Sequence, residues 1–87
     1  MKASVYSPAY DQLRSWLKNQ REQRGLSLRA TAKIMGRHHS VLGKMEQDRK
    51  IDLVEFVEYC LALGADPHEG LKILTNCLNR EEMKERR

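Results

Sequence analysis

The sequence has little of what marks membrane, secreted or metal-binding proteins. No apolar run approaches the roughly 18 residues that span a bilayer, and the first ten residues lack the apolar core of a signal peptide. The two cysteines, Cys60 and Cys77, lie 17 residues apart in apolar segments without a CxxC pair, which favours buried thiols over a disulfide or a metal site. We therefore expect a cytoplasmic protein without a cofactor or a metal.

Motifs that carry catalysis are also missing. The chain has no glycine-rich phosphate loop, no carboxylate pair in a pocket-forming pattern, and no Cys or Ser beside a base at a recognisable spacing. No stretch alternates strictly between apolar and polar residues as a strand does, and there is no internal repeat or low-complexity segment. These absences argue against an enzyme and against a β fold.

The positive charge is concentrated in the first part of the chain. The 87 residues are 40% hydrophobic, which suits one small domain, and their net charge is +4. Residues 1–50 hold 11 Lys or Arg against 4 Asp or Glu, a net charge of +7, whereas residues 51–87 have a net charge of −3. A basic half favours a polyanion such as nucleic acid or an anionic membrane surface, although a solvated charged surface has the same composition.

Apolar spacing and capping signals predict an all-α domain of five helices. Ser7, Ser27 and Asp52 stand as N-caps, and Asp52 is followed three residues later by Glu55, as in a capping box. Glycines close the second and fourth helices, because a left-handed glycine ends a helix without steric cost. The expected helices are 8–24, 28–35, 39–47, 53–63 and one that begins at Pro67.

These helices are expected to form one domain with polar ends. Residues 1–7 are predicted to be a flexible arm, residues 8–80 the domain, and residues 81–87 a charged tail. In the fourth helix, apolar residues at helical spacing predict a buried face that consists of Leu53, Phe56, Val57, Cys60, Leu61 and Leu63.

The second and third helices have the pattern of a helix-turn-helix motif, at about 28–47. Gly36 stands between two short apolar stripes, and the break that follows it is too short for anything but a sharp turn. Ala32 is small enough to let the third helix cross closely, while Leu42 and Met45 point back to hold that helix at its angle. In such a motif the second helix supports the third in the major groove of DNA.

At these positions the chain resembles the lambda-repressor-like family, also called the Cro/cI or XRE helix-turn-helix family. The resemblance covers roughly residues 10–66. It implies five helices, a third helix that contacts DNA, and a partly buried ion pair between Arg21 and Glu46; without it, these two residues could be unpaired surface charges. The matching residues are Arg21, Gly25, Leu26, Ser27, Ala32, Met35, Gly36, Leu42, Met45, Glu46, Ala62, Leu63 and Gly64.

The outward face of the third helix is the predicted base-reading surface. With Leu42 and Met45 facing inward, helical geometry places five residues on the opposite side. Their polar side chains can bond to base edges, and a glycine among them lets the helix approach the bases closely. Lys44 is also a typical solvated lysine, which is the alternative for that position. The five residues are His39, Ser40, Gly43, Lys44 and Gln47.

Residues that flank this face are predicted to contact phosphates. Such contacts fix the register on DNA without carrying sequence information, and they make affinity fall with salt. His38 and His39 also raise the question of a metal site, but adjacent helical residues diverge by about 100 degrees and no partner has ligand spacing. The predicted phosphate contacts are Ser27, Arg29, Lys33, Arg37, His38, Arg49 and Lys50.

A dimer is expected because one short recognition helix contacts only a few base pairs, so two copies pair about a two-fold axis. Apolar residues within 67–80 occupy more than one stripe, which is more than a small core requires. In the alternative, this helix only packs onto the first and fourth helices. The predicted dimer interface is Leu71, Ile73, Leu74, Cys77 and Leu78.

Together these features predict a sequence-specific transcriptional regulator, a repressor that binds a pseudopalindromic operator in double-stranded DNA as a homodimer. It would be nucleoid-associated when bound. The alternative is an antitoxin or an interaction adaptor, in which the helix-turn-helix is a scaffold and the C-terminal helix and polar tail dock a protein partner, such as a toxin or an antirepressor.

Overall fold

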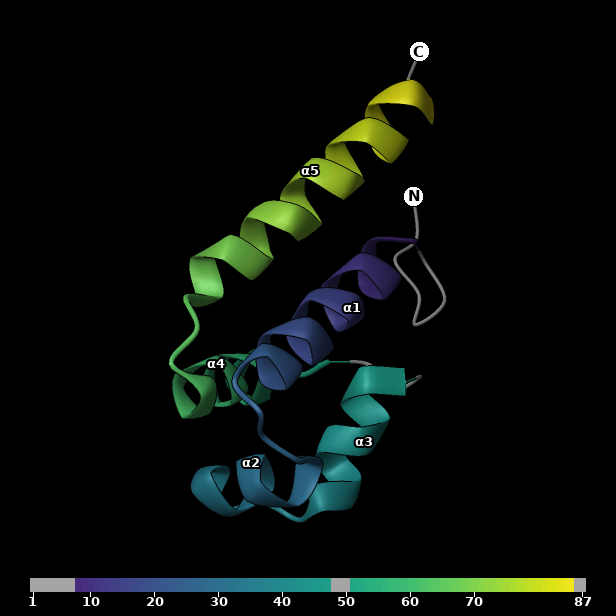
Figure 1. Cartoon of the computed structure of the whole chain (residues 1–87). Coiled ribbons are helices and arrows are strands. Elements are labelled where there is room, and N and C mark those ends of the chain that lie inside the picture. Colours follow the sequence, from purple (N-terminus) through teal and green to yellow (C-terminus); the bar gives the residue numbers. More distant parts are fainter. Residues whose placement is uncertain (1–7, 48–50, 86–87) are drawn as a thin grey trace.

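Five α-helices make up the described structure (Figure 1). The computed structural model describes the backbone of residues 8–47 and 51–85, so the predicted arm with its N-cap Ser7 lies outside the described residues. No strand occurs within these described ranges. The all-α, five-helix prediction is confirmed. The helices are α1 (Pro8–Gln23), α2 (Leu28–Met35), α3 (His39–Gln47), α4 (Leu53–Leu63) and α5 (Pro67–Glu85).

Helices α2 and α4 begin and end at the predicted capping residues. The side chains of Ser27 and Asp52 each accept a hydrogen bond of 3.0 Å from the backbone N–H three residues on. Gly36 and Gly64 close α2 and α4 in the left-handed conformation, with φ of 73° and 76°. Two short helices, α2 and α3, are therefore held three residues apart by a turn that glycine permits.

Helix α5 runs back along α1 (Figure 1). It continues to Glu85, past residue 80, at which the sequence sets the boundary between domain and tail. No glycine or proline follows Gly70 within the helix to interrupt it. The crossing is close at Gly70, because a Cβ there would lie 2.8 Å from the ring of Phe56 and 2.9 Å from that of Trp16.

The core joins α1, α3 and α4 and extends to α2. Leu17 of α1, Leu42 and Met45 of α3 and Cys60 of α4 are fully buried in it. Ala32 of α2 is 2% exposed, at the crossing where the sequence requires a small residue. Both cysteines are buried, in agreement with their apolar surroundings in the sequence.

The buried face of α4 differs from the prediction. The sequence pattern puts Leu53 and Leu61 inside, but they are 65% and 68% exposed, whereas Tyr59 is fully buried. The buried positions recur at three, four and seven residues after Phe56, so helical geometry turns Tyr59 inward and Leu61 outward. The prediction was wrong at Leu53 and Leu61 because it followed side-chain hydrophobicity instead of angular position.

Replacing Gly70 by alanine should destabilise the protein by about 1–3 kcal/mol, because the added methyl group displaces the rings of Phe56 and Trp16. Gly43→Ala is the matched control, since a Cβ there meets only a methyl group of Leu28 at 3.9 Å. That variant should be more stable by up to about 1 kcal/mol, because alanine favours a helix. Urea unfolding followed by circular dichroism measures both, and equal effects would contradict the close crossing.

Candidate nucleic-acid interface

A buried ion pair holds α3 against α1. Arg21 Nε and Nη2 donate to the two carboxylate oxygens of Glu46 at 2.8 and 3.1 Å, and the side chains are only 11% and 6% exposed. Arg21 Nη1 also donates to the carbonyl of Leu26 at 2.7 Å. The hydrogen bond to Glu46 raises the pKa of Arg21 above its usual value. The structure thus has the ion pair that the family resemblance implies.

Tyr59 of α4 is the third member of this cluster. Its hydroxyl donates to Glu46 Oε2. Burial, together with this hydrogen bond to a carboxylate, raises the pKa of Tyr59 well above its ordinary value. Glu46 therefore connects α3 to both α1 and α4. Sequence reasoning missed Tyr59, although its spacing of three residues after Phe56 and four before Leu63 is a core signal.

The opposite side of α3 faces outward. Leu42 and Met45 are fully buried, so the residues on the other side of the helix lie away from the core. Three of the predicted base contacts are exposed, and the two nearest α2 are partly buried. The exposed ones are Ser40, Lys44 and Gln47, and the partly buried ones are His39 and Gly43.

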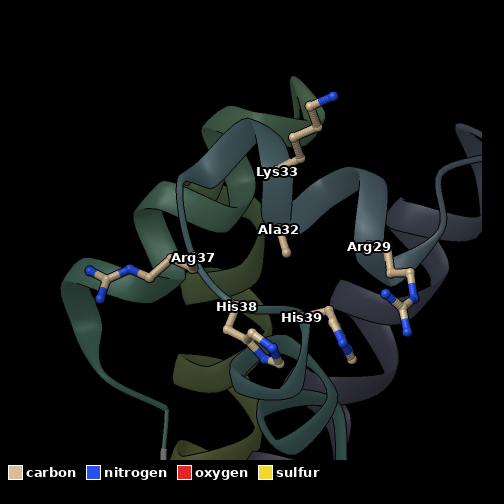
Figure 2. Close-up of a pocket in the computed structure, with 6 residues that line it drawn as sticks. All are labelled: Arg29, Ala32, Lys33, Arg37, His38 and His39. Carbon is tan, nitrogen blue, oxygen red and sulfur yellow. The ribbon is translucent and has the colours of Figure 1, made fainter.

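A hollow of about 320 Å³ lies between α2 and the beginning of α3 (Figure 2). None of the described residues that line it is acidic. Figure 2 shows His39 between Arg29 and His38, whereas the ends of Lys33 and Arg37 extend away from the histidines. The hollow brings together four of the predicted phosphate contacts and one predicted base contact. Its lining residues are Arg29, Ala32, Lys33, Arg37, His38 and His39.

The two histidines stack on each other at this hollow, with ring centroids 4.4 Å apart. His38 Nδ1 accepts the backbone N–H of Ser40 at 3.2 Å and lies 2.8 Å from the Ser40 hydroxyl oxygen, so His38 caps α3. In the neutral ring of His38 the proton is then on Nε2. Desolvation, followed by the effects of Arg29 and His38, lowers the pKa of His39. The neutral form of the His39 ring is therefore favoured.

Arg37 binds α4. Its Nε and Nη2 donate to Glu58 Oε1 at 3.2 and 2.9 Å, and its Nη1 lies 3.7 Å from Glu55 Oε2. The hydrogen bond to Glu58 raises the pKa of Arg37. This residue, which the sequence predicts as a phosphate contact, thus links the turn after Gly36 to another helix. Its partners lie some twenty residues further along the chain, so the ion pair with Glu58 cannot be predicted from local sequence spacing.

Three other predicted phosphate contacts have different surroundings. Ser27 caps α2, while Arg49 and Lys50 lie outside the described residues. Within residues 8–47 and 51–85, no group of three or more His, Cys, Asp or Glu is arranged to hold a metal ion. Nor does any helix in the described part of the chain combine the length and apolarity that crossing a membrane requires.

The predicted dimer residues on α5 divide between interior and surface. Cys77 is 5% exposed and packs inside the single chain, whereas Leu71 is 38% exposed. Ile73, Leu74 and Leu78 are half-buried. Helix α5 does pack onto α1 and α4, and this packing accounts for part of its apolar surface.

Two comparisons with known proteins agree on the family of this fold. A family model described as a helix-turn-helix domain matches residues 12–70. The solved structure of an XRE-family like protein from Pseudomonas syringae pv. tomato str. DC3000 is similar, with 30% sequence identity and a TM-score of 0.72 over 78% of this chain and 84% of that chain. The chain belongs to the XRE-like helix-turn-helix family. Among curated proteins, no match was found.

Membership of the XRE-like family indicates which ligand the surface of α2 and α3 binds. A helix-turn-helix domain of this kind is DNA-binding, and its second helix supports a third that enters the major groove. The outward face of α3, with the adjoining basic hollow, is therefore the candidate nucleic-acid interface.

Tyr59→Phe should lower the free energy of unfolding by about 1–2 kcal/mol at pH 7, because it removes a hydrogen bond to a buried carboxylate. The folded-state pKa of Tyr59 is raised, so its hydroxyl contributes stability that is fully present below about pH 10 and is lost as the pH rises further. Above that pH, the wild type should lose about 1.4 kcal/mol per pH unit that the variant does not lose.

Urea unfolding of both proteins between pH 7 and pH 11 measures this difference. The gap in stability should narrow above pH 10. A gap that stays constant over the whole range would mean that the Tyr59 hydroxyl is not held in the protonated state by its surroundings.

Proposed function

We propose that this protein is a sequence-specific transcriptional repressor that binds a pseudopalindromic operator as a homodimer. The observation that carries the proposal is the orientation of α3: Glu46 is tied to Arg21 and Tyr59 on one side, while the polar residues lie on the other. The concentration of positive charge in residues 1–50 supports DNA as the ligand. Such a protein acts in the cytoplasm and is nucleoid-associated when bound.

In this proposal the exposed face of α3 contacts the bases. Lys44 can donate to the acceptors of guanine, and Gln47 and Ser40 can both donate and accept at base edges. Gly43 lies at the edge of this face, beside Leu28 of α2. The role assigned to it from the sequence is a close approach of the helix to the DNA. These side chains select the sequence, because the major groove presents a different pattern for each base pair.

Residues around this face contact the backbone. Arg29, Lys33 and His38 line the basic hollow beside α3, and Ser27, Arg49 and Lys50 are assigned the same role from the sequence. Arg37 has to leave Glu58 to reach a phosphate, so we assign it to the link between the turn and α4 instead. Backbone contacts of this kind make the affinity fall steeply with salt.

The dimer is proposed to form through α5 and the adjoining part of α4. Leu71 is the most exposed of the predicted interface residues, and Leu53 of α4 lies beside it at a small apolar hollow of about 90 Å³. Ile73, Leu74 and Leu78 complete the surface, whereas Cys77 belongs to the interior of each chain. Burial of leucine side chains between two copies would supply the hydrophobic contribution to association.

An antitoxin or adaptor is the second candidate. It is favoured by the exposed apolar residues Val54 and Leu61 on α4, which are 62% and 68% exposed and lie outside the proposed DNA surface. Such a surface fits a protein partner. If α2 and α3 are only a scaffold, replacing Lys44 should not change the binding of a duplex. The Lys44→Ala experiment below therefore separates the two functions.

Lys44→Ala should weaken binding to the preferred operator by about tenfold to a hundredfold and relax its specificity, because a bidentate base contact contributes about 1–3 kcal/mol. The operator is obtained by selecting fragments of the source genome with the purified protein, and affinity is measured by fluorescence anisotropy. Lys72→Ala, the same change at an exposed lysine of α5, should bind as the wild type does. Unchanged binding by Lys44→Ala would argue against base contact by α3.

Leu71→Glu should raise the dissociation constant of the dimer by at least about tenfold, because it places a charge in an apolar contact. Light scattering with sedimentation over a range of concentrations measures the number of subunits. The control is Ile34→Glu, the same change at a residue of α2 that is 58% exposed. If the wild type is a monomer at every concentration, or if both variants dissociate equally, α5 is not the interface.

A further inference from the structure

The hollow beside α3 contains two stacked histidines, whose rings can take up a proton. The proposed recognition of bases does not require this proton. Arg29 of α2 and His39 of α3 line the same hollow. The positive charge of Arg29 contributes to the lowering of the pKa of His39. His38 stacks on His39, and its Nδ1 is engaged by Ser40. His38 forms the cap of α3, whereas His39 does not. His39 can therefore gain a proton without breaking that cap.

The charged side chains that line the hollow with His39 are basic. Arg29 of α2 lies on the side of His39, whereas the ends of Lys33 of α2 and Arg37 of the turn extend away from the histidines (Figure 2). The neighbouring ring from the turn is His38. The two carboxylates near this turn, Glu55 and Glu58, are paired with Arg37, whose end extends away from the histidines (Figure 2). A proton added to His39 therefore meets repulsion from Arg29, and none of the described residues that line the hollow is an acid that could compensate for it.

We propose that the hollow between α2 and α3 holds a phosphate of the DNA backbone between Arg29 and His39, and that His39 takes up a proton as the phosphate enters. The inference rests on the proposed DNA binding. It adds that the protein takes up a proton at His39 when the DNA binds. It also assigns His39 to the backbone rather than to a base. The hollow, at about 320 Å³, is large enough to admit a phosphodiester group.

The coupling has a definite sign. In the free protein the pKa of His39 is lowered, so the ring is mostly neutral at pH 7. A phosphate in contact with the ring favours the charged form and raises that pKa. Between the two pKa values, binding consumes a proton, and the affinity rises as the pH falls, by up to about tenfold per pH unit for one proton.

The experiment measures binding of a mixed-sequence duplex of about 20 base pairs, at constant ionic strength and low salt, from pH 5.5 to pH 8.0. A duplex of arbitrary sequence serves because every duplex carries the phosphate. Wild type and His68→Gln should bind more tightly as the pH falls. His68→Gln is the matched control, since it makes the same substitution at an exposed histidine that lies outside the hollow and is paired with Asp66 at the beginning of α5. In His39→Gln the pH dependence should be lost.

A second measurement observes the ring directly. The NMR shift of the His39 ring proton, followed against pH, should give a higher pKa in the presence of the duplex than in its absence. This measurement on the wild type keeps the inference testable even if His39→Gln folds poorly, which a thermal melt of the variant reveals.

Each other outcome overturns a defined part of the scheme. Duplex binding that does not change with pH, or a pH dependence that persists in His39→Gln, overturns the assignment to His39 and leaves the proposed function standing. A pH dependence seen with the selected operator but not with the mixed-sequence duplex means that His39 contacts a base instead of a phosphate. If neither the mixed-sequence duplex nor any fragment of the source genome binds at any pH, the proposed function itself is overturned.

Discussion

The position of α3 depends on one buried carboxylate. Glu46 receives two hydrogen bonds from Arg21 of α1 and one from Tyr59 of α4, in a place where water has little access. A buried charge is costly unless its acceptor positions are satisfied, so the three helices must meet at this residue. Apolar contacts at Leu42 and Met45 exclude water but do not select a direction. The directional hydrogen bonds therefore fix the rotation of α3 about its axis, and with it the side that faces solvent.

The other end of α3 is fixed by different means. His38 caps its first turn through Nδ1, and the preceding turn is linked to α4 by the ion pair of Arg37 and Glu58. Both contacts are exposed, and exposed ion pairs contribute little to stability. The end of α3 nearest the hollow is therefore held less firmly than the end at Glu46, and it is this end that presents the histidines to a ligand.

Sequence reasoning predicted the boundaries of α2 and α4 because caps are local. Ser27, Asp52 and the closing glycines act within a few residues, so their effect can be deduced from neighbours alone. The pairing of Arg21 with Glu46 came from a family resemblance and not from spacing. Contacts between distant segments were not predicted. The pair of Arg37 and Glu58 has no local sequence pattern. Tyr59 was missed because the prediction ranked residues by hydrophobicity and chose Leu61 instead. The angular position of Tyr59 relative to Phe56 and Leu63 was the better guide to the buried face than hydrophobicity.

Because Lys44 and Gln47 are exposed, changes that alter recognition can occur at different positions from changes that alter the fold. Neither residue belongs to the hydrophobic core, and the polar cluster at Glu46 lies on the other side of the helix. Substitutions at these positions can therefore accumulate without a folding penalty, since surface changes away from caps and cores have small effects. Descendants of one ancestral domain can then diverge in what they recognise while keeping the same scaffold.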